Sequence, residues 1–198
     1  FSAEQMSIFK NISDNWLGSR KEKGFSLGFF SEDYLQRAPI AVVKNTQEEI
    51  VAFATIMPTY TNNKVGTIDL MRYDPKKAPS GSMDFLFLHL FAYMKEEHIQ
   101  WFNLGMAPLS NVGTSRKSFL QERIAYLVYE FGSHFYSFHG LREYKSKYAT
   151  NWVSRYTLYS RDSWIAYVMI ALLIIDNTPV EQTQGRINGL KKWIRRKY

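Results

Sequence analysis

Residues 1–100 alternate between helical and extended hydrophobic patterns. Residues 3–22 repeat apolar side chains at a period near 3.6, which predicts an amphipathic helix. Residues 25–30 predict a strand interrupted by Gly28, and residues 31–37 predict a short helix capped by Ser31. A glycine inside a strand is typical of a bulge or of a ligand that comes close to the backbone. Gly28 is therefore a candidate substrate-binding residue.

Three apolar runs follow and predict an antiparallel meander. Residues 40–44 and 49–57 suit a hairpin joined through the polar turn at residues 45–47. Residues 65–72 supply the next strand, which ends just before a Pro/Gly-rich loop at residues 74–81.

A long helix is predicted from Ser82 to about residue 98, with Asp84 in its first turn. Its apolar side chains lie almost all round the helix, so we expect it to be buried against the sheet. His89 falls inside this helix, and we expect it to be a core residue rather than a catalytic base. Residues 100–104 predict one more short strand.

The second half adds further elements and completes an α+β pattern. They are a helix at 117–134, an extended segment at 135–138, helical turns at 141–148, a strand at 152–159, a buried helix at 164–175 capped by Ser163, and a basic helix at 185–198. This order argues for an α+β fold with a mixed sheet. Because no Gly/Ser-rich linker divides the chain, we expect one module over residues 1–198, with residues 163–198 as its C-terminal helices.

Composition and charge narrow the classes of function. The chain has no cysteine, which excludes disulfides, cysteine-based zinc sites and a cysteine nucleophile. It begins at Phe1 rather than Met, so we expect a fragment of a longer protein. The apolar run at residues 164–175 is shorter than the roughly 20 residues of a membrane span. The net charge of +7 is concentrated in residues 101–198, which indicates RNA or phospholipid partners, or a basic face kept for solubility.

Several familiar chemistries have no motif in this sequence. It contains no P-loop, Rossmann fingerprint, H-E-x-x-H pair or G-x-S-x-G elbow, and its four histidines lack metal-ligand spacing. An acetyl-CoA loop requires [RQ]-x-x-G-x-[GA], and the nearest string, residues 182–187, fails at its last position. We therefore predict no cofactor and no metal.

One group of acidic and basic residues at the ends of predicted elements suits a catalytic site. Asp69 and Arg72 end an apolar strand just before a loop, where α/β folds commonly present chemistry, although a surface ion pair is the simpler interpretation of that pattern alone. Glu122 lies on a helix, and Arg142 and Lys145 follow it among aromatic residues. An aminoacyl substrate suits such a set, because carboxylates hold its ammonium groups and positively charged Lys or Arg side chains stabilise an oxyanion. Solvated helix faces remain the alternative.

Several strings, in order and with close spacing over residues 14–160, resemble the C-terminal catalytic domain of bacterial phosphatidylglycerol lysyltransferases, the multiple peptide resistance factor family. They are EKGFSLG (22–28), DLMR (69–72), GSMDFLF (81–87), FNLGMAPL (102–109), GLREYKSKY (140–148) and Trp152 with Arg155 and Tyr156.

The resemblance implies a GNAT-like fold, with a mixed, mainly antiparallel sheet flanked by helices. It also implies a position as the second of two tandem modules behind an N-terminal flippase. Family members transfer lysine, or sometimes alanine, from aminoacyl-tRNA to phosphatidylglycerol. This transfer lowers the negative charge of the membrane and gives resistance to cationic antimicrobial peptides. The expected partners are lysyl-tRNA, phosphatidylglycerol and the preceding domains. The expected location is the cytoplasmic face of the bacterial cell membrane, and the isolated fragment need not be active.

Within that resemblance, four residues are expected to be catalytic. Asp69 and Glu122 would hold a lysyl ammonium group, Arg72 would orient Asp69 and the acceptor, and Lys145 would stabilise the oxyanion or the leaving ribose oxygen. The expected substrate-binding residues are Gly28, Met71, Asp84, Met106, Arg142 and Lys147.

Other functions stay open at this point. A GNAT-like enzyme that acylates another acceptor, such as a peptidoglycan precursor, has a similar pattern, as does a non-catalytic module that binds RNA or membranes. The basic helix at residues 185–198 suits lipid headgroups, tRNA phosphates or plain solvent equally well.

Overall fold

The computed structural model describes residues 1–20, 22, 28–57, 65–131, 138–158, 160 and 164–176. The chain divides into two compact units. The first consists of Phe1–Asn103 and Leu173–Tyr198, and the second of Leu104–Leu172. The expectation of one module over the whole chain stays a prediction.

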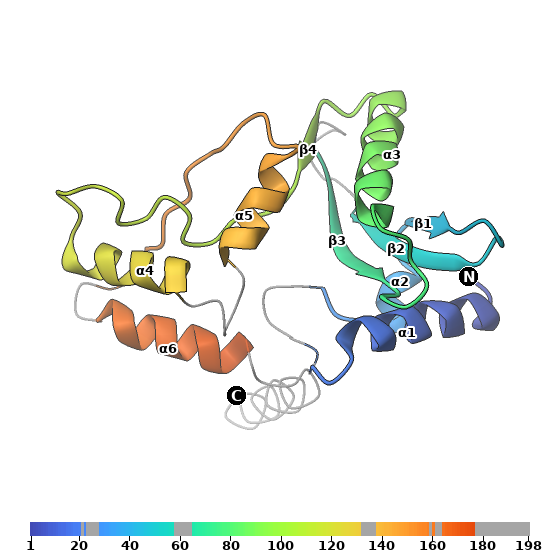
Figure 1. Cartoon of the computed structure of the whole chain (residues 1–198), viewed down its shortest axis with the longest axis horizontal. Coiled ribbons are helices and arrows are strands. Elements are labelled where there is room, and N and C mark those ends of the chain that lie inside the picture. The colour runs from blue at the N-terminus through green and yellow to red at the C-terminus, as the bar shows by residue number, and fades with distance from the viewer. Residues whose placement is uncertain are drawn as a thin grey trace, which may run out of the picture. The chain divides into compact units, whose positions relative to one another are not determined.

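The first unit is built on a four-stranded mixed sheet (Figure 1). Its strands are β1 (Ile40–Lys44), β2 (Ile50–Met57), β3 (Val65–Tyr73) and β4 (Trp101–Asn103), in the order β1-β2-β3-β4. The first three pair antiparallel, which confirms the meander, and β4 joins β3 in parallel. The predicted class, α+β with a mainly antiparallel mixed sheet flanked by helices, is confirmed.

Helices cover both faces of this sheet. On one face lie α1 (Ala3–Leu17), which opens with a capping box between Ser2 and Gln5, and the short α2 (Glu32–Leu35). On the other lies α3 (Ser82–Glu96). Two buried clusters fill the two interfaces. The first contains Met6, Phe9, Ile12, Leu35, Phe53 and Leu70, and the second contains Val43, Val51, Ala52, Ala54, Leu86 and Leu90.

The second unit contains helices joined by long loops. Its elements are α4 (Leu120–Phe131), α5 (Phe138–Ser146) and the start of α6 (Ile165–Asp176), the helix that leads back to the first unit. Within α4 the described side chains include none that is buried. Among the described residues, none of the helices is long and apolar enough to span a bilayer.

Two expectations about α3 are wrong, the identity of its cap and the burial of His89. The residue that caps α3 is Gly81, in a left-handed conformation with φ of 84°, whereas Ser82 is the first helical residue. α3 packs against the sheet through Leu86 and Leu90 as expected, although Phe85 and Leu88 among its apolar side chains are exposed. His89 is also exposed and lines a groove of about 440 Å³ between β1 and α3, so it is not a core residue.

Two further expectations also fail in the second half. Residues 152–158, the described part of the strand predicted at 152–159, form no strand and are not part of the four-stranded sheet. α6 is helical as predicted, but Tyr167 and Ile170 are exposed, so its described side chains do not form a buried core helix. The predicted basic helix at 185–198, the Ser163 cap, residues 25–27 of the predicted strand and residues 135–137 of the predicted extended segment lie outside the described residues. Residues 28–30 form no strand, and Phe138 is the first residue of α5.

Candidate functional site

A β-bulge in β3 sets the geometry of the candidate site. Ala54 and Ile56 are two residues apart on β2. Their partners on β3, Met71 and Ile68, are three residues apart. One extra residue is therefore accommodated in β3. A classic bulge turns two consecutive side chains toward one side of the sheet and increases the local twist.

The bulge explains how Asp69 and Arg72 come to share a face. In a regular strand, side chains three residues apart point to opposite faces. Here Asp69 contacts α2 and Arg72 contacts α1, the two helices of the same face. Thr55, opposite the extra residue, fixes the irregularity because its hydroxyl accepts a hydrogen bond from the Leu70 amide at 3.0 Å.

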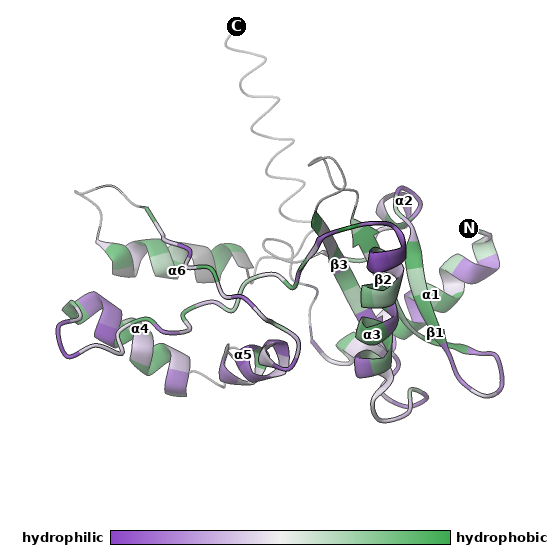
Figure 2. Ribbon diagram, turned by 90° about the horizontal axis from the view of Figure 1, so that it is seen from above, coloured by the Kyte–Doolittle hydropathy of each residue, from purple (hydrophilic) through white to green (hydrophobic). Residues whose placement is uncertain are grey.

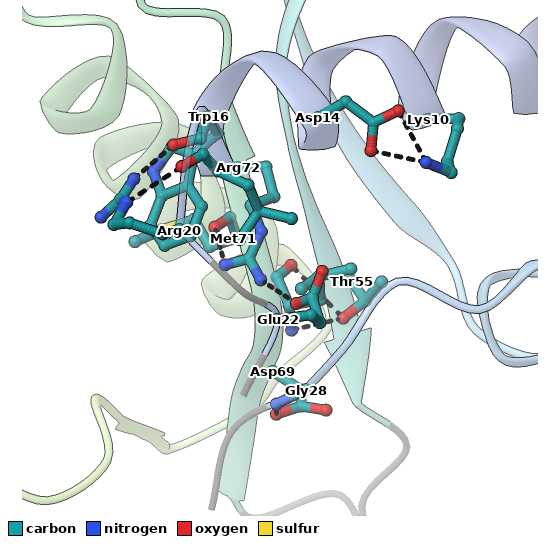
Figure 3. Close-up of polar contacts among 12 residues, drawn as sticks. Lys10, Asp14, Trp16, Arg20, Glu22, Gly28, Thr55, Asp69, Met71 and Arg72 are labelled. Atoms are coloured by element: carbon teal, nitrogen blue, oxygen red, sulfur yellow. Dashed lines mark hydrogen bonds and ion pairs between the residues drawn. The ribbon is translucent and has the colours of Figure 1, made fainter. Parts of the chain in front are cut away.

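Both carboxylate oxygens of Asp69 are held in place (Figure 3 shows the contact with Gly28). The backbone N–H of Gly28 donates to Oδ1 at 3.1 Å, and the hydroxyl of Tyr34 donates to Oδ2 at 2.6 Å. Burial and then Asp69 itself raise the pKa of Tyr34 to about 12, so the phenol stays a donor near neutral pH. Asp69 remains exposed, and its carboxylate is therefore positioned yet reachable from solvent.

Glycine is needed at position 28 because Asp69 comes so close. A Cβ atom built there would lie 2.5 Å from Oδ2 of Asp69, closer than any real contact. The sequence pattern indicated close approach by a ligand; the structure shows close approach by the Asp69 carboxylate.

Arg72 is enclosed between an acid and an aromatic ring (Figure 3). Its side chain is nearly buried, Nη2 donates to Oε1 of Glu22 at 2.6 Å, and the guanidinium lies 3.9 Å from the centroid of the Trp16 ring. Arg20 lies 4.3 Å from the same ring and donates to the Trp16 carbonyl. Burial lowers the pKa of Arg72, and the charge of Glu22 opposes that shift.

These contacts correct one expectation. Arg72 was expected to orient Asp69 directly, but its ion pair is with Glu22, whereas Asp69 is oriented by Gly28 and Tyr34. Sequence reasoning missed the role of Glu22, although this residue opens one of the resembling strings. For Tyr34 the sequence holds no local signal, since it lies 35 positions from Asp69.

In the second unit, α5 carries the basic candidates. Lys145 donates from Nζ to the carbonyl of Met106 at 2.7 Å, and burial lowers its pKa. Arg142 lies 3.4 Å from the centroid of the Trp152 ring and contacts the Ser110 hydroxyl. Lys147 lies 5.0 Å from the Tyr144 ring. The interleaved bases and aromatics of this segment are thus paired in space.

The remaining candidates are placed as follows. Glu122 is exposed and accepts the Phe119 amide at 3.0 Å, which caps the start of α4. Met106 is exposed on a loop, and Asp84 lies in the first turn of α3. Met71 packs against the cluster under α3, on the face opposite Asp69.

The candidates thus fall into two groups, one in each unit. Gly28, Asp69 and Arg72 gather in the first unit around the β3 bulge, and Met106, Arg142 and Lys145 gather in the second around α5. Among the described residues there is no cluster of His, Asp and Glu that could hold a metal ion.

Comparisons with known proteins show the family to which this chain belongs. The family model for the C-terminal part of phosphatidylglycerol lysyltransferase matches residues 1–159. A phosphatidylglycerol lysyltransferase of Bacillus subtilis is 49% identical over 169 residues, covering 85% of this chain and 20% of the relative. One from Staphylococcus aureus is 44% identical over 163 residues, covering 82% of this chain and 19% of the relative. The chain therefore spans about a fifth of the length of these relatives.

Two solved structures agree with the sequence comparisons. L-PGS from Bacillus licheniformis superposes with a TM-score of 0.72 at 46% identity, covering 90% of this chain and 52% of that one. The C-terminal domain of a putative lysylphosphatidylglycerol synthetase from Agrobacterium fabrum has a TM-score of 0.58 at 42% identity. The match covers 73% of this chain and 42% of that chain. The chain belongs to the phosphatidylglycerol lysyltransferase family and corresponds to the C-terminal part of its members.

Proposed function

We propose that the protein containing this chain transfers a lysyl group from lysyl-tRNA to the glycerol hydroxyl of phosphatidylglycerol. Family membership supports the reaction class. The observation that carries the proposal at the level of residues is the Asp69 carboxylate, held by Gly28 and Tyr34 yet exposed. An oriented and accessible carboxylate suits a substrate ammonium group, which is what a lysyl ester offers.

The reaction exchanges one ester for another. The lipid hydroxyl attacks the lysyl carbonyl carbon, a new C–O bond forms, and the bond to the ribose oxygen breaks. The proton of the lipid hydroxyl ends on that ribose oxygen. Because the donor ester is already activated, no enzyme nucleophile is needed, which agrees with the lack of cysteine.

Each candidate residue has a defined task in this scheme. Asp69 binds a lysyl ammonium group, with Glu122 as a second carboxylate for the same purpose. Arg72, held by Glu22 and Trp16, lines the acceptor end. Lys145 is assigned to the oxyanion, which its ammonium group would stabilise.

The half-buried environment of Lys145 supports its assignment. Burial lowers the pKa of Lys145 because it destabilises the charged ammonium form relative to water. A developing oxyanion would stabilise that ammonium group by pairing with it. Its contact with the Met106 carbonyl fixes the direction of the side chain. Arg142 and Lys147, on the same helix, are suited to tRNA phosphates.

The wider setting is part of the same proposal. A preceding module of the same fold and an N-terminal flippase complete the protein, which acts at the cytoplasmic face of the bacterial membrane. Lysylation lowers the negative charge of the membrane and gives resistance to cationic antimicrobial peptides.

A lipid-labelling assay tests the proposal. Protein that also carries the preceding module is incubated with radiolabelled lysyl-tRNA and phosphatidylglycerol vesicles, and the lipids are then resolved. We expect labelled lysyl lipid, with none from phosphatidylcholine vesicles. Failure to label the lipid, or labelling only of a peptidoglycan precursor added in parallel, would refute the proposal.

Two substitutions then test the assigned residues. Asp69→Ala and Lys145→Ala should each reduce transfer strongly while leaving the melting temperature nearly unchanged, because Asp69 is exposed and neither substitution removes a core side chain. Undiminished turnover in one variant would remove that residue from the site.

A further inference from the structure

Helix α4 carries its apolar stripe on the exposed side. Four side chains recur at helical spacing and, with Val128 beside them, define the α4 stripe. They are Leu120, Ile124, Leu127 and Phe131. All five are exposed, from Val128 at 41% to Phe131 at 76%. Figure 2 shows hydrophobic and hydrophilic positions side by side along this helix.

The opposite side of α4 is the one that packs within the second unit. A Cβ atom at Gly113 would collide with the Glu122 carbonyl and lie 3.0 Å from Cβ of Tyr126, so the preceding loop packs on this side. One turn further on, Tyr129 stacks on His139 of α5 at 5.8 Å between ring centroids. A helix of a globular protein normally buries its apolar side. α4 does the reverse, and exposed apolar patches of this kind mark interaction surfaces.

Basic residues border the start of the stripe. Arg116 and Lys117 are exposed in the segment just before α4, and Arg123 lies on the edge of the helix, where its guanidinium donates to the Arg116 carbonyl at 2.6 Å. The exposed Phe119 stands between these charges and the stripe. A helix with Leu, Ile and Phe on one side and Arg or Lys along the border matches helices that lie in the plane of a membrane interface.

We propose that the α4 stripe docks on an anionic lipid bilayer and thereby brings the second unit to its lipid acceptor. Charge complementarity favours this occupant, because residues 104–172 carry eight Lys or Arg against four Asp or Glu. The inference rests on the proposed function, in which phosphatidylglycerol is both acceptor and anionic lipid. It adds a specific surface on the chain for bilayer contact, separate from the groups that act on the ester.

Vesicle co-sedimentation with a matched pair of variants tests the surface. Leu127 on α4 and Leu88 on α3 are both mid-helix leucines, with exposures of 53% and 60%. The 198-residue chain should bind vesicles that contain phosphatidylglycerol, and bind them less well in high salt or when they are pure phosphatidylcholine. Leu127→Asn should weaken this binding by about tenfold, because it removes one leucine from the lipid contact. Leu88→Asn should leave it unchanged.

Other results would overturn the proposal. These are no binding by the wild-type chain, or equal loss in the two leucine variants. A dimer in sedimentation velocity that Leu127→Asn dissociates, without change in vesicle binding, would assign the stripe to a second copy instead. Circular dichroism checks the fold of each variant, and Ile124→Asn repeats the test if Leu127→Asn fails to fold.

A second acceptor separates this inference from the proposed function. With short-chain phosphatidylglycerol dispersed as single molecules, lysyl transfer by the longer protein should be the same for wild type and Leu127→Asn, whereas transfer to vesicles should fall. Loss of transfer to both acceptors in the wild type would refute the proposed function, while the binding experiment would still decide the role of the stripe.

Discussion

At the scale of single residues, the candidate site depends on what holds Asp69 more than on Asp69 itself. The sequence pattern singled out Asp69 and Arg72 because they end an apolar strand before a loop. Their partners Glu22, Trp16 and Tyr34 could not be found that way, since the contacts join positions 35 or more apart. Local pattern identifies a charged side chain, but only the folded chain shows what orients it.

Gly28→Ala should separate activity from stability. Its Cβ would collide with the Asp69 carboxylate, so the carboxylate must move, and displacements of this size cost about 100-fold in rate. Lysyl transfer by the longer protein measures the effect. Gly81→Ala is the control. The added Cβ would contact no other atom, but alanine is strained at a φ of 84°. This variant should therefore have a lower melting temperature without slower transfer. The opposite pattern would show that Gly28 has no part in placing Asp69.

Tyr34→Phe should change how stability depends on alkaline pH. The folded-state pKa of Tyr34 is raised to about 12, so its contribution is complete below the unfolded value of 10.0 and is lost as pH rises through 12. The free energy of unfolding in urea should therefore fall more steeply for wild type than for Tyr34→Phe between about pH 10 and pH 12. The other tyrosines are common to both proteins and cancel. Parallel curves would contradict the raised pKa of Tyr34 that burial and Asp69 produce.

At the scale of elements, the strands were predictable and several helix environments were not. The hairpin and β3 carry short apolar runs bounded by turn residues, and these patterns are local. Residues 152–158 alternate in the same way but remain irregular, because a strand needs a neighbour that the pattern cannot supply. The exposure of α3, α4 and α6 likewise depends on which surfaces meet. The β3 bulge, which aligns Asp69 with Arg72, left no trace that the spacing rules could detect.

Thr55→Val should destabilise the bulge specifically. Thr55 is fully buried, and its hydroxyl satisfies the Leu70 amide, so valine would leave a buried donor without an acceptor. We expect a loss of about 1–3 kcal/mol in the free energy of unfolding, measured with urea. Thr67→Val is the control, because its hydroxyl contacts a carbonyl at a less buried position and its loss should be smaller. Equal losses would mean that the bulge does not depend on Thr55.

At the scale of the whole molecule, the uneven charge is the feature with the widest effect. Residues 101–198 carry net +8 and residues 1–100 net −1, which was readable from the sequence and favours an anionic partner. What composition could not show is how some of these charges are placed: Arg142 against Trp152, Lys145 against the Met106 carbonyl, and Arg123 beside an apolar stripe.

Lys147→Gln should weaken tRNA binding uniformly and reduce its salt dependence. If Lys147 contacts a phosphate, its removal should lower the slope of log affinity against log salt by about one. Filter binding of lysyl-tRNA over a series of salt concentrations measures that slope. Lys10→Gln on α1, where Lys10 pairs with Asp14, should leave the slope unchanged. An unaltered slope for Lys147→Gln would place that lysine away from the RNA.

The bulge in β3 also restricts how this segment can change in evolution. Deleting Leu70 would restore a regular ladder, but it would remove a side chain from the core cluster that packs against α1. Asp69 and Arg72 would then be two positions apart and would still share a face, but the Asp69 carboxylate would be shifted by one residue relative to Gly28 and Tyr34, which hold it. Lineages that keep the chemistry must therefore keep the number of residues between this acid and this base.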